Sequence, residues 1–122
     1  MTDISDIREL VHKLRKECPW DREQTIKSLK QDLLDEAKEL AEAIDKDDTE
    51  NIREEIGDVL FGLLLMTEIA EEQGMFTLEE SLNELKEKMI RRHPHVFGDA
   101  EAKTAEDAKK LFYEAKKNEK SS

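Results

Sequence analysis

Four carboxylates stand at matched spacing in two segments of the sequence and could bind a metal ion. Glu36 and Glu39 lie in "LLDEAKELAEAI", and Glu55 and Asp58 lie in "REEIGDVLFGLL". In each pair the two acids are three residues apart, so on a helix they are separated by about 60° and share one face. Carboxylate oxygens are the ligands that Mg²⁺ prefers, and a bound Mg²⁺ keeps further positions for water or phosphate oxygens.

Each acid pair lies beside the apolar stripe of an expected amphipathic helix. The spacing of apolar residues predicts one helix over about 23–44 and a second over about 50–73, joined by the polar turn "DKDDT". Counted from Leu33 or from Ile52, both pairs fall at about 240° and 300° around the helix. If the two helices pack antiparallel along their stripes, we expect the pairs to face one another across a groove.

The same pattern can arise by chance in an acidic chain. With 31 Asp and Glu among 122 residues, pairs such as those in "EIAEE" and "LEES" recur without a metal role. On spacing alone, a cation site and a solvated acidic face are about equally well supported, and the matched position beside both stripes favours the cation site. Four converging carboxylates repel one another, and a divalent cation removes that cost.

Composition and charge restrict the partners. Charged residues make up 42% of the chain and hydrophobic residues 37%, with few glycines and prolines, which is typical of a helical protein with a narrow core. The net charge of −11 repels nucleic-acid backbones and anionic membranes, so a polyanionic ligand needs a cation. A lone cysteine, a polar N-terminus and no apolar run of membrane-spanning length predict a cytoplasmic protein without membrane contact.

We expect one all-α domain over residues 1–122, without strands and with a frayed tail from about residue 118. Further helices are predicted over about 3–16, 77–92 and 104–117. The segments "CPWD" and "HPHVFGD" are predicted to be breaks between helices. The run "VLFGLLLM" is apolar all round a helix, so its burial predicts a homodimer or a larger even assembly.

Four motifs together resemble the MazG branch of the all-α nucleoside triphosphate pyrophosphohydrolases. They are "CPWDREQT", "DEAKELAEAI", "REEIGDVLF" and "RRHPHVFGD", and the resemblance runs from about Leu14 to the last expected helix. It implies a four-helix core with an additional C-terminal helix, completed as a dimer or a dimer of dimers. It also implies Mg²⁺-dependent cleavage of an NTP or dNTP to the monophosphate and pyrophosphate, with Mn²⁺ as a substitute metal and nucleotide-pool housekeeping as the role.

The resemblance also implies roles for the acids. Glu36, Glu39, Glu55 and Asp58 would be both the metal ligands and the catalytic residues. Asp35 stands where the family often has a glutamate. Asp35 and Glu39 are the candidates for the general base.

Substrate contacts follow from the same resemblance. Lys88, Arg91 and Arg92 share one helix face and match a basic stretch that contacts the nucleotide in related enzymes. Alternatively, they are a solvated basic helix end. Phe112 lies on the last helix, where relatives use a tryptophan. The remaining predicted substrate contacts are Asp32, Asp35 and Arg53.

Trp20, in "CPWD", has two interpretations. It could stack on a nucleotide base, or it could anchor the packing after the helix break. We favour the anchor, because a lone tryptophan at such a break usually packs against the core.

A second class of function, without catalysis, is an alternative to the enzyme. The chain could be a non-catalytic module, either a sensor of metal–nucleotide complexes or a helical dimerisation scaffold. A sensor would bind nucleotide without releasing pyrophosphate. A scaffold would tolerate the loss of all four acids. Within the enzyme class, a narrow dUTP or dCTP pyrophosphatase is an alternative to a broader nucleotide range.

Overall fold

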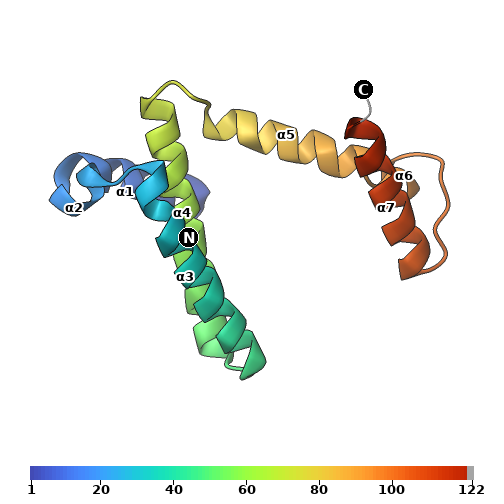
Figure 1. Ribbon diagram of the computed structural model, residues 1–122, viewed down its shortest axis with the longest axis horizontal. Helices are drawn as coiled ribbons and strands as arrows, with labels where there is room; N and C mark the ends of the chain where they lie inside the picture. The colour runs from blue at the N-terminus through green and yellow to red at the C-terminus, as the bar shows by residue number, and fades with distance from the viewer. Residues whose placement is uncertain (121–122) are drawn as a thin grey trace. The chain divides into compact units, whose positions relative to one another are not determined.

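The computed structural model describes residues 1–120, and this part of the chain is helical and has no strand. Its helices are α1 (Ile4–Glu17), α2 (Pro19–Glu23), α3 (Ile26–Asp45), α4 (Thr49–Glu72), α5 (Leu78–Arg91), α6 (Pro94–Phe97) and α7 (Ala105–Lys120) (Figure 1). The predicted all-α class is confirmed, and the four-helix core stays a prediction. The chain forms two compact units, Met1–Leu78 and a second unit that begins at Glu79.

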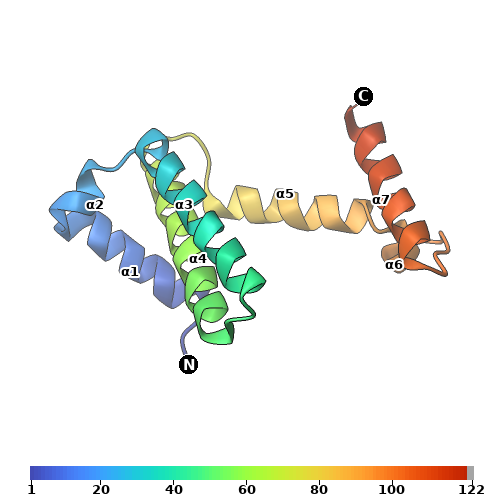
Figure 2. The ribbon, with the colours of Figure 1, turned by 60° about the horizontal axis from the view of Figure 1, so that its bottom comes forward.

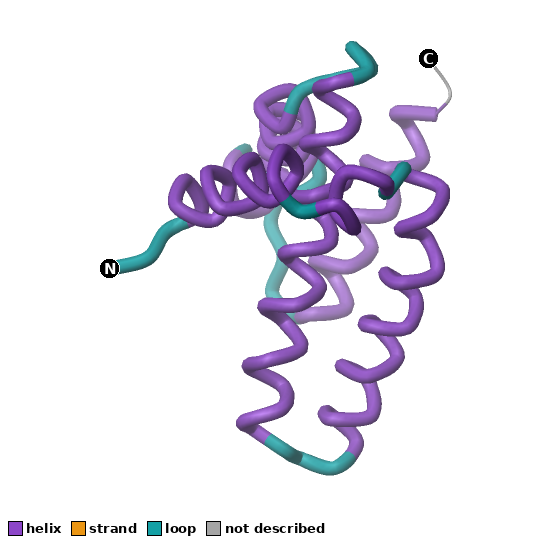
Figure 3. Tube along the Cα trace, turned by 90° about the vertical axis from the view of Figure 1, so that its left-hand side faces the viewer, coloured by secondary structure: helices purple, strands orange, loops and turns teal. Residues whose placement is uncertain are grey.

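The first unit is built on an antiparallel hairpin of α3 and α4, whose short turn is visible in Figure 3. Thr25 caps α3, because its side chain accepts from the backbone N–H of Ser28 at 3.0 Å. Asp48 caps α4 by accepting from the backbone N–H of Asn51 at 3.3 Å. Between them Asp47 adopts a φ of 55°, a conformation that aspartate adopts more often than most residues. The polar turn thus ends one helix and starts the next.

The core of the first unit lies where α1 meets the hairpin. Leu65 and Ile69 of α4 are 1% and 0% exposed, and Val11 of α1 packs against them. Leu29 of α3, Leu64 of α4 and Leu78 complete the buried cluster. Burial of these side chains fixes α1 and α3 on α4, and with them the direction in which the acids of the hairpin point.

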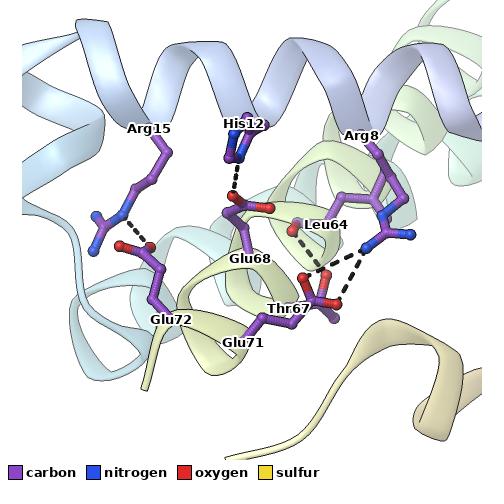
Figure 4. Close-up of polar contacts among 8 residues, drawn as sticks. All are labelled: Arg8, His12, Arg15, Leu64, Thr67, Glu68, Glu71 and Glu72. Carbon is purple, nitrogen blue, oxygen red and sulfur yellow. Dashed lines mark hydrogen bonds and ion pairs between the residues drawn. The ribbon is translucent and has the colours of Figure 1, made fainter. Parts of the chain in front are cut away.

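Helix α1 packs against α4 (Figure 2), and a row of ion pairs joins the two helices (Figure 4). The pairs are Arg8 with Glu71 at 3.1 Å, His12 with Glu68 at 2.6 Å and Arg15 with Glu72 at 2.6 Å. Arg15 continues the row, because its Nη1 also donates to the backbone carbonyls of Asp21, Arg22 and Gln24 at the end of α2. Helix α2, which carries Trp20, is therefore held to α4 through Arg15.

The break predicted at "CPWD" is confirmed, because α1 ends at Glu17 and Cys18 is its C-cap, but the short helix α2 that begins at Pro19 was not predicted. The loop predicted at "HPHVFGD" is wrong in part, because it contains the short helix α6, which begins at Pro94. Proline suits the first turn of a helix, because its φ is already helical and its missing N–H has no partner there. The frayed tail stays a prediction, and α7 continues to Lys120. Residues 121–122 lie outside the described part.

The apolar run at 59–66 is only partly buried within one chain. Leu64 and Leu65 are in the core, whereas Leu63 is 42% exposed and Ile56, two turns earlier on the same side, is 53% exposed. Ile56 and Leu63 form what we call the apolar face of α4. This face has no covering element in the described part of the first unit.

The second unit contains α5, α6 and α7. Helix α6 packs against α7, and the ring of His93 lies edge-on to Phe112 with centroids 5.5 Å apart. Across the described residues of both units, no helix is long and apolar enough to cross a membrane.

Candidate active site

The hairpin brings carboxylates from both predicted pairs together. Glu36, Glu39 and Glu55 each place one carboxylate oxygen within 4.8 Å of the other two. Glu36 and Glu39 project from α3, and Glu55 projects from α4. This is the arrangement expected if the two helices pack antiparallel along their apolar stripes. Asp58, one turn further along α4, is outside this group of three and lines the adjacent cleft.

Within the described part of the chain, none of the three carboxylates forms an ion pair with a basic side chain. Oε2 of Glu36 and Oε2 of Glu55 are buried and accept no hydrogen bond within the described chain. The pKa of Glu55 is raised to about 7, first by a hydrogen bond with the side chain of Glu36. Burial and the negative charges of Glu39, Glu36 and Asp58 raise it further. A cation at this position would remove the repulsion.

This donor set fits a hard divalent cation. All the converging atoms are carboxylate oxygens, and Glu36 and Glu55 each carry a buried oxygen without a donor among the described residues. Mg²⁺ and Mn²⁺ take such ligands and keep part of their coordination shell for water or phosphate oxygens. The fit rests on the buried oxygens as well as on the cluster itself, since exposed acids often gather without a metal.

A cleft of about 450 Å³ lies beside the acids, in the size range of small-molecule sites. Its acidic lining consists of Asp32, Asp35, Glu36, Glu39 and Asp58. Its apolar lining includes Trp20, Leu29, Leu33, Val59, Phe61 and Leu65. The cleft can therefore accept a ligand that has a flat apolar part and an anionic part bound through a cation.

Two of the three additional predicted contacts on the hairpin line the cleft. Asp32 and Asp35 are on its wall, and Asp35 accepts a hydrogen bond from the side chain of Gln31 at 2.9 Å. Arg53 is exposed on α4 and is not among the residues that line the cleft. The substrate roles of all three stay predictions.

Trp20 is not the packing anchor that we favoured. Trp20 is 54% exposed and lines the same cleft as the acids of the hairpin. The prediction failed because "CPWD" forms a helix that presents Trp20 at the surface. Phe61, which sequence reasoning did not single out, lines the same cleft. Its position three residues after Asp58 was the available signal, because that spacing puts both side chains on one helix face.

The basic residues of the predicted substrate site gather in the second unit. Arg91 and Arg92, at the end of α5, both form ion pairs with Glu119 of α7. The guanidinium of Arg92 lies 5.4 Å from the centroid of the Phe112 ring. Lys88 is half-buried one turn earlier on α5. The structure thus brings Phe112 and the two arginines together, and it adds Glu119, which the sequence motifs did not indicate.

We expect the stability of the metal-free protein to fall with rising pH because of Glu55. Its pKa in the folded state, about 7, lies above the ordinary value of 4.5, so folding favours the protonated form. This contribution to stability is fully present below the unfolded pKa of about 4.5 and is lost as the pH rises through about 7. Melting temperatures measured in EDTA at about pH 5 and about pH 8 should therefore diverge more in the wild type than in Glu55→Gln.

Added Mg²⁺ provides the second arm of that measurement. Because the cation binds the ionised carboxylates, it should raise the melting temperature more at the higher pH. An identical pH dependence in the wild type and in Glu55→Gln would contradict the raised pKa of Glu55.

The hairpin and its acids define a class of all-helical proteins in which two consecutive helices bring carboxylates together beside a cleft. The model of the MazG nucleotide pyrophosphohydrolase domain family matches residues 24–97, which include α3 and α4. More than half of the chain lies within this match. The chain therefore belongs to the MazG nucleotide pyrophosphohydrolase domain family, as its motifs predicted.

Individual relatives agree with this membership. The nucleoside triphosphate pyrophosphohydrolase/pyrophosphatase MazG of Thermotoga maritima is 46% identical over 99 residues, which cover 80% of this chain and 39% of that protein. The uncharacterized protein YabN of Bacillus subtilis is 43% identical over 120 residues, which cover 97% of this chain and 24% of that protein. The chain thus spans well under half the length of these two curated relatives.

A solved structure supports the fold along most of the chain. The crystal structure of a mazG-related protein from Thermotoga maritima matches with a TM-score of 0.80 and 32% identity. The match covers 93% of this chain and 99% of that one.

Proposed function

We propose that the protein is a Mg²⁺-dependent nucleoside triphosphate pyrophosphohydrolase, which cleaves an NTP or dNTP to the monophosphate and pyrophosphate. The observation that carries the proposal is the convergence of Glu36, Glu39 and Glu55, with two unpartnered buried oxygens, at the edge of a cleft that has an aromatic wall. Membership of the family supports the same reaction class. The proposed role is housekeeping of the nucleotide pool.

The acids of the hairpin would hold the cation. In this proposal the ligands are Glu36, Glu39, Glu55 and Asp58. When bound, the cation offsets charge on the phosphoryl oxygens and lowers the pKa of a water molecule. Two of the ligands are half-buried, which keeps them in fixed positions on a rigid pair of helices.

Other side chains would handle the proton and the phosphates. Glu39 or Asp35 would orient the attacking water and accept its proton, because both carboxylates line the cleft. Lys88, Arg91 and Arg92 would bind the phosphates and stabilise the leaving pyrophosphate. No covalent nucleophile is required.

Trp20 and Phe61 would form the surface on which the base stacks. Stacking of one base on an aromatic side chain contributes enough that its loss weakens binding roughly 10- to 100-fold. Trp20→Ala should therefore raise KM for the nucleotide by about tenfold or more, with a smaller change in kcat. Steady-state kinetics would measure both. Trp20→Phe, which keeps an aromatic ring, should retain most of the affinity, and a wild-type KM for Trp20→Ala would contradict this role.

The proposed reaction is tested by resolving the products of each common NTP and dNTP incubated with Mg²⁺, with Mn²⁺ and with EDTA. Monophosphate and pyrophosphate, formed only with the metal, are the expected products. Diphosphate and orthophosphate would mean that a different bond is cleaved and would overturn the proposal. Nucleotide binding without any product would identify the sensor. A narrow preference for dUTP or dCTP would place the protein among the specialised enzymes.

The assembly in this proposal is a homodimer or a dimer of dimers. The apolar face of α4, with Ile56 53% and Leu63 42% exposed, is the surface that a second copy of the chain would cover. Light scattering should give a mass at least twice the 14.2 kDa of one chain. A charge on this face, as in Leu63→Glu, should reduce the mass toward that of one chain. A monomeric wild type would contradict the proposed assembly.

A further inference from the structure

We infer that Glu119 is a positioning residue that holds Arg91 and Arg92 for phosphate binding, an inference that rests on the proposed function. Glu119 is on α7, beyond the segment 24–97 that the family model matches. In this inference Glu119 does not contact the nucleotide and acts through the two arginines.

One carboxylate fixes both guanidinium groups. Arg91 Nε donates to Glu119 Oε1 at 2.7 Å. Arg92 donates from Nε to Oε1 at 3.2 Å and from Nη2 to Oε2 at 2.8 Å. The Arg92 guanidinium also lies over the ring of Phe112. A planar group that is bonded along one edge and stacked on one face has few other orientations.

The same contacts leave N–H donors available to an anion. Arg91 uses only its Nε, so neither of its terminal amino groups has an acceptor within the described chain. The side chain of Arg91 is 53% exposed, whereas that of Arg92 is 12% exposed. Arg91 also borders a surface hollow of about 530 Å³ that Glu119 and Asn118 help to line. Arg91 therefore presents its free donors at the surface, and Arg92 is embedded beside it.

Charge explains why a carboxylate is needed at this position. Arg91 and Arg92 are adjacent and repel one another, and Glu119 offsets one of their two positive charges while it binds both. The pKa of Glu119 is lowered to about 2, first by the hydrogen bond from Arg92 and then by that from Arg91, so Glu119 stays ionised at neutral pH. The group keeps a net positive charge in a chain whose net charge is −11. It can therefore attract a phosphate.

A rival role for Glu119 is that of an internal competitor, which would occupy the arginines in place of a phosphate. The positions of the bonds favour positioning instead. Glu119 occupies the Nε side of each guanidinium, so a phosphate can bind the terminal amino groups of Arg91 while the carboxylate stays in place. The two roles predict opposite changes in affinity when the carboxylate is removed.

The test compares Glu119→Gln with the wild type and with Glu114→Gln, which removes an exposed acid from the same helix. We would measure KM and kcat with Mg²⁺ and the preferred NTP, and the Kd of its α,β-methylene analogue. Losing charge-assisted hydrogen bonds should raise KM and Kd about tenfold, with kcat changed about twofold or less. Glu114→Gln should match the wild type. Glu119→Asp, which keeps the charge, should recover part of the affinity.

Each other outcome decides the question. An unchanged KM in folded Glu119→Gln would overturn the inference. A lowered KM would also overturn it and would identify Glu119 as a competitor of phosphate. Circular dichroism of each variant would show whether α7 still forms, and Glu119→Ala provides a second variant if Glu119→Gln does not fold. If the wild type binds the analogue but releases no pyrophosphate, only the proposed function fails, and the Kd values then decide the role of Glu119. If the wild type binds no analogue, both fail.

Discussion

Glu55→Gln should lower the rate of pyrophosphate release by roughly a hundred- to a thousandfold or more while leaving the protein folded. Glutamine has nearly the same shape as glutamate but offers one neutral oxygen in place of a charged carboxylate. The carboxylate of Glu55 is the contribution of α4 to the group in which oxygens lie within 4.8 Å of one another. Without it, the cation is expected to bind weakly. Product formation with Mg²⁺, followed over time, measures the loss.

A stability measurement separates this loss from unfolding. Because Glu55 is held close to Glu36 and Glu39, removing its charge relieves repulsion, and the metal-free variant should melt at or above the wild-type temperature. Glu54→Gln is the matched control, since Glu54 is the exposed neighbour on the same helix and lies outside the cluster. It should keep wild-type activity. Full activity in Glu55→Gln, or an equal loss of activity in Glu54→Gln, would contradict the proposed role of the clustered carboxylates in binding the cation.

Leu65→Ala should destabilise the fold by about 2–5 kcal/mol, which is the range for truncating a buried leucine. Leu65 is 1% exposed and packs within the cluster that joins α1, α3 and α4. It also lines the cleft, so the cavity left by the mutation would open beneath the site. Urea unfolding followed by circular dichroism measures the free energy of unfolding.

Leu10→Ala provides the comparison, because it removes the same atoms from a solvated position. Leu10 of α1 is 46% exposed. We expect its free energy of unfolding to stay within about 0.5 kcal/mol of the wild type. If the two variants lose similar stability, the core does not lie where the buried cluster places it.

Local sequence patterns were sufficient to predict the hairpin and its acids. The apolar stripes of α3 and α4 fix which sides of the helices meet. The three-residue spacing then fixes where Glu36, Glu39 and Glu55 project. Caps and turn residues such as Thr25 and Asp48 mark the ends of the helices in the sequence itself. Each of these signals depends on residues that are neighbours along the chain.

The rest depends on contacts between residues far apart in the sequence, which a single sequence does not reveal. Trp20 reaches the cleft because Arg15 fixes the end of α2 and itself pairs with Glu72 of α4. Glu119 meets Arg91 and Arg92 across 28 and 27 residues of chain. Neither pairing follows from helical periodicity, since charged side chains at exposed positions have many candidate partners.

The distance along the sequence between contacting residues has a consequence for the order in which the cleft forms during folding. The helices that carry the acids are consecutive and need only a short turn, whereas the ion pairs of α1 with α4 join residues 56 to 63 positions apart. Closing a longer loop costs more entropy and is slower. We therefore expect the hairpin to form early and α1 to dock later, bringing Trp20 to the cleft last. Mutations in the α1 ion pairs should then speed unfolding and leave the folding rate nearly unchanged.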